Sequence, residues 1–306
     1  MAHVDLAGGR SGTARVHLPE PRLQAQRVAD HPCYNARAHT VFGRIHVPVA
    51  PRCNLQCNYC VRKFDCANEN RPGVTAGVIG VDQALQRISS ALEAEPRLRV
   101  LGVAGPGDAL ANEPTFALFE QARTRFPQLK RCLSTNGLLL PDRIDDVVRA
   151  DVSALTVTVN AVDPEVGQRI YARARYRSVT YRGRAAFELL SRQQLEGLRL
   201  AARAGLTVKV NSVLIPGVND HHLVEVARLV KSLGAFVHNV IPVIPVGAFA
   251  DVEPPDEACV NRARTECAQV IGQFDHCMRC RADAIGVPGE EGCAAALAPP
   301  VGEGVR

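Results

Sequence analysis

Short apolar runs rich in β-branched residues alternate with longer stretches of helical periodicity from about residue 44 onward. In the longer stretches, apolar residues such as Ala84, Leu85 and Ile88 recur on one face of a helix. Strand–helix repeats of this kind predict a parallel sheet, because each parallel step needs a crossover helix. Six repeats fit an α/β fold of the partial (β/α)6 TIM-like barrel type, and a doubly wound open sheet is the alternative. The expected strands are residues 44–50, 98–104, 129–134, 155–159, 207–212 and 237–241.

The regions outside these repeats predict two extensions. Residues 1–43 form an N-terminal arm without periodicity, which we expect to be extended over its first 30 or so residues, and residues 44–272 form the barrel. Residues 273–306 form a C-terminal extension that contains a C-x2-C pair and a Gly/Ala/Pro-rich tail, expected to be mobile. The segment 178–184 lies in a long insertion after the fourth strand, and it is either a lid over the site or an ordinary surface excursion.

Composition and charge narrow the class of protein. No apolar run approaches the roughly 18–20 residues that cross a bilayer, and the N-terminus has no apolar signal-peptide core. We therefore expect a cytoplasmic protein without a membrane partner. The formal charge of +5 comes from 36 basic and 31 acidic residues spread along the chain, and there is no Trp. Because nucleic-acid binders usually cluster basic and aromatic residues, nucleic acid is not expected as a partner.

Eleven cysteines are the unusual feature of the composition. A long chain without an export signal points to metal or cluster ligation rather than to disulfides. Cys53, Cys57 and Cys60 form a C-x3-C-x2-C motif directly after the first expected strand. Three thiolates on one loop can ligate three irons of a [4Fe–4S] cluster and leave the fourth iron open for a substrate. A structural zinc loop is the alternative, although zinc sites more often show paired C-x2-C knuckles.

This motif and its position resemble the radical S-adenosylmethionine (SAM) superfamily, whose open iron chelates SAM. The resemblance implies that Tyr59 lies against the adenine, although loop packing would also explain it. It also implies that the AGPGD loop contacts the SAM methionyl group and that Asn211 and Ser212 contact its carboxylate or ribose; turn chemistry and strand capping are the alternatives. The residues of that loop are Ala104, Gly105, Pro106, Gly107 and Asp108.

Longer blocks resemble one family within this superfamily, the NifB family of nitrogenase-cofactor maturases. They are residues 31–39, 61–74, 104–112, 162–171, 210–220 and 276–286. The resemblance implies a lyase- or transferase-like enzyme of nitrogen fixation. Such an enzyme fuses two [4Fe–4S] clusters, K1 and K2, with a SAM-derived carbide and an added sulfide into an [8Fe–9S–C] cofactor precursor. One SAM donates a methyl group, and a second supplies the 5′-deoxyadenosyl radical.

The same resemblance implies ligands for the two substrate clusters, and hence three [4Fe–4S] clusters in all. K1 would be held by Cys33, Cys66, Cys132 and His46, with His31 and His39 as competing histidines. A buried strand histidine is the alternative interpretation of His46. K2 would be held by Cys277 and Cys280, for which a redox C-x2-C pair or half a zinc site is the alternative. These two cysteines would act directly in catalysis, because the cluster they hold is the one that is methylated.

Other residues and partners are less closely constrained. Glu69 is a candidate proton relay or a solvated loop residue. Cys259 and Cys267 are expected to be packing residues, and Cys293 an incidental one. The implied partners are SAM, iron–sulfur cluster donor proteins and separate carrier or scaffold proteins of nitrogenase assembly. The competing functions are a radical SAM enzyme that modifies a peptide or small molecule with auxiliary clusters, and a non-enzymatic iron–sulfur scaffold.

Overall fold

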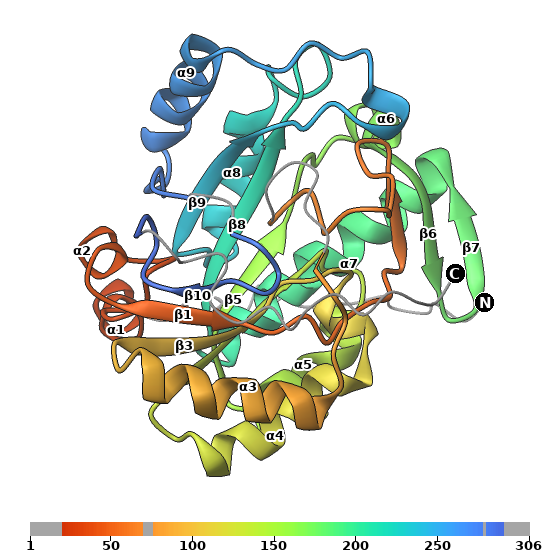
Figure 1. Cartoon of the computed structure of the whole chain (residues 1–306). Coiled ribbons are helices and arrows are strands. Elements are labelled where there is room, and N and C mark those ends of the chain that lie inside the picture. Colours follow the sequence, from red (N-terminus) through yellow and green to blue (C-terminus); the bar gives the residue numbers. More distant parts are fainter. Residues whose placement is uncertain (1–19, 70–75, 278–279, 291–306) are drawn as a thin grey trace, which may run out of the picture.

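The structure is a computed structural model that describes residues 20–69, 76–277 and 280–290. Its centre is a curved sheet of seven strands in the order β10-β1-β3-β4-β5-β8-β9 (Figure 1). Six strands run parallel in sequence order, and β10 pairs antiparallel with β1. The strands are β1 (Gly43–His46), β3 (Leu98–Val103), β4 (Lys130–Thr135), β5 (Val152–Thr158), β8 (Thr207–Leu214), β9 (Val237–Pro242) and β10 (Ile285–Gly286). The partial barrel expected from the sequence is confirmed.

A helix follows each parallel strand and covers the outer side of the sheet (Figure 1). The first of them shows the reason, because Ala84, Leu85, Ile88 and Ala91 form its buried face and join the main core. These helices are α3 (Val81–Ala94), α4 (Glu113–Arg125), α5 (Leu140–Arg149), α7 (Gly183–Arg203), α8 (Leu223–Ser232) and α9 (Glu257–Ala268). Two 3-10 turns, η1 (Ala109–Ala111) and η2 (Gly247–Phe249), lie in the loops.

A small antiparallel sheet lies beside the barrel and contains the expected insertion. Its strands are β2 (Leu55–Cys57), β6 (Tyr171–Tyr176) and β7 (Val179–Arg182), with β6 in the middle. A short helix, α6 (Pro164–Ile170), leads into β6, and the hairpin packs on α7. The segment 178–184 is therefore the second strand of a hairpin and the start of α7 (Figure 1).

The described part of the N-terminal arm is not extended, contrary to expectation. It forms α1 (Pro21–Arg27) and α2 (Ala36–His39). Proline at the first turn and the good helix formers that follow it explain α1. Tyr34 packs with Val100, Ala154 and Val237 near the amino ends of their strands. The arm thus covers the end of the barrel opposite to the carboxyl ends of the strands.

The C-terminal extension connects the two edges of the sheet. Gly272 O accepts a hydrogen bond from His238 N on β9, and Phe274 N donates one to His238 O. The chain then crosses to β1, where β10 pairs with Arg44 and Ile45. Cys277 and Cys280 lie on this crossing segment. Cys293 and the expected mobile tail lie outside the described residues, apart from the tail's first positions.

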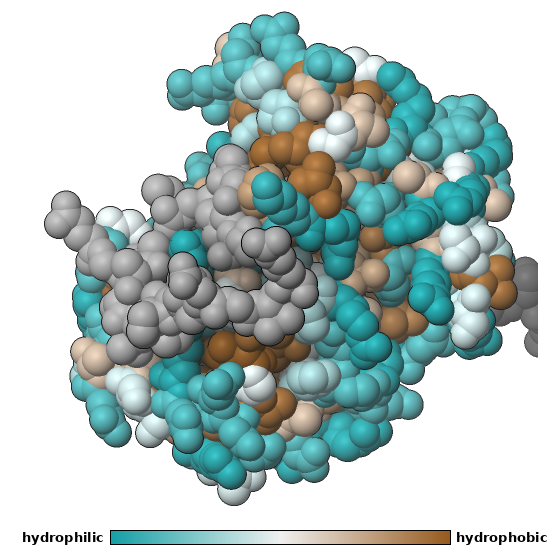
Figure 2. All heavy atoms as spheres, turned by 45° about the vertical axis from the view of Figure 1, so that its right-hand side comes forward, coloured by the Kyte–Doolittle hydropathy of each residue, from teal (hydrophilic) through white to brown (hydrophobic). Residues whose placement is uncertain are grey.

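Hydrophilic residues cover most of the face shown in Figure 2. In the part of the chain that the structure describes, none of the helices combines the length and apolar character needed to cross a membrane.

Candidate active site

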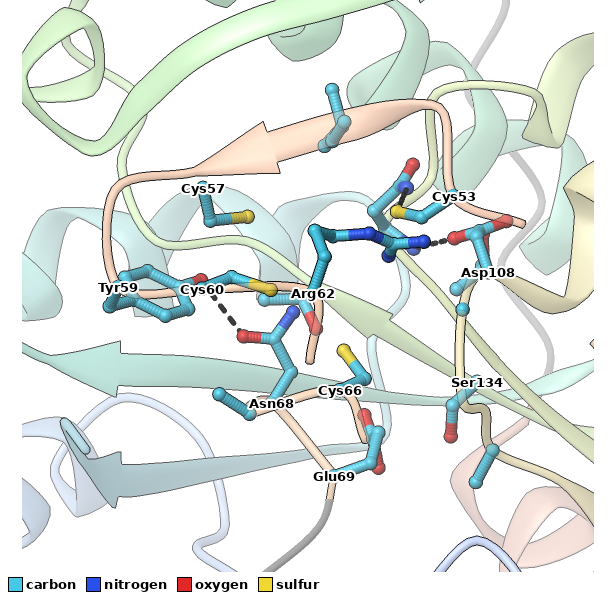
Figure 3. A pocket seen from close by; sticks show the side chains of 17 residues that line it. Cys53, Cys57, Tyr59, Cys60, Arg62, Cys66, Asn68, Glu69, Asp108 and Ser134 are labelled. Atoms are coloured by element: carbon cyan, nitrogen blue, oxygen red, sulfur yellow. Dashed lines mark hydrogen bonds between the residues drawn. The ribbon is translucent and has the colours of Figure 1, made fainter. Parts of the chain in front are cut away.

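Four cysteines line a first cavity near the carboxyl ends of the strands. Cys53, Cys57 and Cys60 come from the loop around β2, and Cys66 follows on the same segment (Figure 3). All four are free thiols. Among the described residues, no three His, Cys, Asp or Glu side chains converge closely enough to hold a single metal ion. Thiolates spread around a cavity suit the separated irons of a cubane cluster better than one zinc ion.

Backbone contacts fix the shape of the cysteine loop. Gln56 Nε2 donates to Cys60 O at 2.5 Å and to Cys57 O at 3.1 Å. Asn136 Nδ2 donates to Cys53 Sγ at 3.7 Å. Burial raises the pKa of the Cys53 thiol to about 11, with a further contribution from Asp108. Buried thiols of this kind become thiolates when a metal centre supplies the compensating charge, so the donor set fits a [4Fe–4S] cluster.

The AGPGD loop packs directly against the residues that precede Cys53. Gly107 N donates to Ala50 O at 2.6 Å, and Asp108 N donates to Arg52 O at 2.9 Å. A Cβ at Gly107 would lie 2.2 Å from Arg52 O, so only glycine fits this approach. Of the five loop residues, Ala104, Gly107 and Asp108 line the first cavity. The Asp108 carboxylate accepts hydrogen bonds from Leu110 N, Thr135 Oγ1 and Asn136 N.

Tyr59 is buried at the wall of the first cavity. Its hydroxyl donates to Asn68 Oδ1 at 2.8 Å (Figure 3) and accepts from Asn160 Nδ2 at 2.6 Å. Asn160 is itself held by Val213 N and by Asn219 Nδ2. The hydroxyl therefore connects the loop after the cysteines to the buried interior. The expected contact between the ring and adenine stays a prediction.

Asn211 and Ser212 point to opposite faces of β8, as adjacent strand residues do. Asn211 Nδ2 donates to Glu69 Oε1 at 3.0 Å and to Asn68 O at 3.3 Å. Ser212 Oγ contacts Val159 O and lies 2.9 Å from His238 Nε2. Neither side chain lines the first cavity. Their contact with SAM stays a prediction, and the contact that the structure gives Asn211 is with Glu69.

A second cavity gathers the cysteines that are distant in sequence. Cys33 comes from the arm, Cys132 from β4, and Cys277 and Cys280 from the C-terminal extension. Burial raises the pKa of the Cys33 thiol to about 12, against the opposing charge of Lys209. Cys66 lines the first cavity instead. Of the cysteines expected to bind K1, the structure thus brings Cys33 and Cys132 together and places Cys66 nearer the C-x3-C-x2-C loop.

The two cavities adjoin, because Glu69, Ala104 and Ser134 line both of them. On β4, Cys132 lines only the second cavity and Ser134 lines both. Residues two apart on a strand share a face and lie about 7 Å apart along it. The second cavity therefore lies deeper in the barrel, toward the arm. Glu69 stands at the boundary, next to Cys66 and Asn68 (Figure 3).

All three candidate histidines line the second cavity. His46 Nδ1 lies 3.2 Å from Arg281 O, and burial followed by the charge of Arg44 lowers its pKa to about 4. His31 is buried and its Nδ1 accepts from Cys33 N, while its Nε2 has no hydrogen-bond partner among the described residues. His39 Nδ1 contacts Pro32 O. The choice between them stays open, and His31 is the one with an unused ring nitrogen.

No motif in the sequence indicates two buried cations at the second cavity. Lys209 on β8 lines the cavity and is 4% exposed, and its Nζ donates to Cys33 O at 3.4 Å. Arg44 on β1 is 1% exposed, and its Nη2 donates to Cys280 Sγ at 2.7 Å. The available signal was a lysine between Val208 and Val210 in a strand expected to be buried, since buried lysines need a partner.

Comparison with known proteins agrees with this geometry. A family model described as the radical SAM superfamily matches residues 47–230. The chain is 47% identical over 266 residues to the FeMo cofactor biosynthesis protein NifB of Chlorobaculum tepidum, covering 86% of this chain and 63% of that protein. It is 46% identical over 276 residues to NifB of Klebsiella pneumoniae, covering 88% and 59% respectively. The chain thus spans less than two thirds of the length of these relatives.

Solved structures share the fold at low sequence identity. A radical SAM methyltransferase from Sphaerobacter thermophilus matches with a TM-score of 0.51 and 21% identity, covering 76% of this chain and 64% of that one. SuiB of Streptococcus suis bound to S-adenosylmethionine matches with a TM-score of 0.55 and 10% identity, covering 83% and 53%. At these identities the likeness concerns the fold alone.

Proposed function

The chain belongs to the radical SAM superfamily, and from this premise we propose that it fuses two [4Fe–4S] clusters into an [8Fe–9S–C] cofactor precursor. The reaction uses a SAM-derived carbon and an added sulfide, as the similarity to NifB proteins suggests. The observation that carries the proposal is the pair of adjoining cavities, one lined by the C-x3-C-x2-C cysteines and the other by four cysteines from three distant segments.

In this proposal, Cys53, Cys57 and Cys60 hold the resident cluster. A [4Fe–4S] cluster bound there supplies the one electron that cleaves SAM. The protein's contribution is to hold and orient. Asn136 and Gln56 fix the cysteine loop, Gly107 lets the AGPGD backbone approach it, and Tyr59 positions Asn68 at the wall.

The second cavity receives the substrate clusters. Cys33, Cys132 and one histidine, together with Cys66 at the boundary, would hold K1, and Cys277 with Cys280 would hold K2. Lys209 and Arg44 place positive charge against these thiols, which favours an anionic cluster. Glu69 stands where both cavities meet, so its carboxylate can take a proton from a carbon that is carried between them.

The proposal also names partners and a compartment. Cluster donors must fill the second cavity, and a carrier or scaffold protein of nitrogenase assembly must receive the product. Ten free cysteines among the described residues suit the reducing cytoplasm, where thiols stay available as ligands.

The test is anaerobic reconstitution followed by incubation with SAM and a reductant. About twelve irons per chain are expected for three cubane clusters. S-adenosylhomocysteine and 5′-deoxyadenosine should appear together, because methyl transfer and radical chemistry both occur. About four irons, or deoxyadenosine alone, would contradict the proposal and favour a radical SAM enzyme that acts on a peptide or small molecule.

Variants separate the two cavities. Cys57→Ala should abolish all SAM cleavage, whereas Cys277→Ala combined with Cys280→Ala should suppress S-adenosylhomocysteine and spare slow deoxyadenosine release. Cys259→Ala is the control, because this cysteine lies on α9, away from both cavities. Identical behaviour of the Cys57 and Cys277/Cys280 variants would contradict the division of roles.

A further inference from the structure

Three arginines stand on the outer face of the small antiparallel sheet. Arg173 and Arg175 on β6 and Arg182 on β7 are all exposed. The register places Arg173 directly opposite Arg182, and Arg175 opposite Thr180, so the three side chains share one face. We call these three residues the arginine face. The inward residues of the hairpin, Ala174 among them, pack in the second core cluster.

The arginine face lacks the acidic neighbours that nearby arginines have. Arg177 pairs with Asp142, and Arg184 pairs with Glu165 and Glu188. Within the described ranges, neither Arg173, Arg175 nor Arg182 forms an ion pair. Like charges directly opposite each other on two strands destabilise the pairing. Three unpaired cations held together on a rigid sheet are therefore suited to an acidic partner that neutralises them.

The position of this face is informative, because its third strand is the cysteine loop. Arg173 is paired with Gln56 of β2, so the row Gln56–Arg173–Arg182 runs across all three strands. Gln56 Nε2 in turn donates to Cys57 O and Cys60 O. One side chain thus separates the arginine face from the backbone that carries two of the cluster cysteines. A partner seated here comes close to the resident cluster.

We propose that the arginine face docks an acidic one-electron carrier protein, of the small flavin or iron–sulfur class, that reduces the cluster at Cys53, Cys57 and Cys60. The inference rests on the proposed function, because only SAM cleavage there requires an electron. One electron leaves the reduced carrier and enters the cluster, and no bond forms or breaks. The face does not suit nucleic acid, since the neighbouring Tyr176 and Tyr181 pack inward and offer no exposed stacking surface.

The experiment measures cluster reduction by stopped-flow absorbance in the full-length reconstituted protein. The donor is an acidic flavodoxin in its hydroquinone state, and dithionite is the small reductant that needs no docking. The test variant combines R173Q, R175Q and R182Q. The control variant combines R203Q, R228Q and R262Q, which removes the same charge from exposed arginines on α7, α8 and α9.

With flavodoxin at about 20 mM salt, the test variant should be reduced at least about tenfold more slowly than the wild type or the control variant. The difference should vanish near 0.5 M salt, because added salt screens surface charge. With dithionite, all three proteins should be reduced equally. This pattern supports the arginine face as the docking surface.

Several results would overturn the inference. They are an equal loss in the control variant, no loss in the test variant, or a loss that persists with dithionite. Normal reduction of the test variant combined with failed transfer of product to an acidic carrier protein would assign the face to a different partner and also overturn it. Failure of the proposed function itself is distinguishable, because dithionite-reduced wild type would then release no 5′-deoxyadenosine from SAM.

Discussion

Lys209 shows how one residue can prepare a cavity for an anion. Its Nζ lies 5.2 Å from the ring centroid of Tyr34 and 5.4 Å from that of Phe274. Burial acts to lower the pKa of Lys209, but the surrounding Cys33, Cys277 and Glu69 together raise it. The side chain therefore keeps its charge inside the barrel, where an anionic cluster is the natural counterpart.

Lys209→Met should weaken the second cavity without affecting the first. Removing the cation leaves an anionic cluster uncompensated, so we expect the reduction potential of the substrate cluster to fall by about 60 mV, equivalent to a tenfold change for a one-electron couple. A redox titration followed by electron paramagnetic resonance measures this shift. Lys231→Met on exposed α8 is the control. An unchanged potential would show that Lys209 has no electrostatic role.

His238 makes the stability of the cluster-free protein depend on pH. It is fully buried with Ser212 Oγ and Gln273 as polar neighbours, and burial lowers its pKa from 6.5 to about 4. Between those pH values the unfolded chain binds the extra proton, so the stability is lost as pH falls from 6.5 toward 4. The loss attributable to this residue is about 3 kcal/mol.

Urea unfolding at several pH values tests this expectation. His238→Gln should flatten the dependence of the unfolding free energy on pH below 6.5, whatever its effect at neutral pH. An equally steep dependence in the variant would mean that other histidines carry it.

At the scale of elements, the contact between α6 and α7 fixes the sheet that carries the cysteine loop. A Cβ at Gly167 would lie 2.1 Å from Phe187 Cδ2. Phe187 is fully buried and stacks on Tyr171, with ring centroids 6.1 Å apart. Tyr171 begins β6 and pairs with Cys57. The packing of two helices thus reaches a cluster cysteine through one aromatic pair.

Gly167→Ala should loosen this region, because the Phe187 ring has no space to move. We expect the unfolding free energy to fall by about 1–3 kcal/mol, as for other overpacked cores. Hydrogen exchange should become faster in β6 and β7 than in β3 or β4. Gly272→Ala is the control, since a Cβ there meets nothing within 4 Å. Uniform exchange across the chain would contradict a local role for the contact.

At the scale of the whole molecule, the second cavity exists only because both ends of the chain return to the barrel. Phe274 lies in a cluster with Val28 and Tyr34 of the arm, Val237 of β9 and the thiols Cys33, Cys132 and Cys277. The same segment carries the hydrogen bonds to β9 that direct the extension across the opening. The arm and the extension therefore depend on one shared cluster.

Phe274→Ala should separate the two cavities experimentally. Truncating a buried Phe costs about 3–5 kcal/mol. The iron content after reconstitution should fall from about twelve to about four, because the first cavity keeps its own cysteines. Phe126→Ala, at the end of α4, controls for loss of core packing. Loss of all iron in the Phe274 variant, or retention of about twelve, would contradict this view.

The local features of the chain were predictable. Apolar periodicity located all six parallel strands to within a few residues, and the spacing of Cys53, Cys57 and Cys60 placed them on one loop. These features depend on neighbouring residues, so the sequence contains them directly. Helix α1 was missed, because seven residues show too little periodicity, and its order comes from packing on the barrel.

The deeper site was settled by the tertiary structure. Cys33 and Cys280 belong to opposite ends of the chain, and only the return of the arm and the extension brings them to one cavity. The orientation of Asn211 toward Glu69 and the contact of Arg44 with Cys280 also follow from which face of a strand turns inward. By itself, the sequence determined the barrel and its cysteine loop, because period and spacing are local properties. The second cavity, its buried cations and the arginine face were decided by folding, because they join residues whose proximity no local pattern encodes.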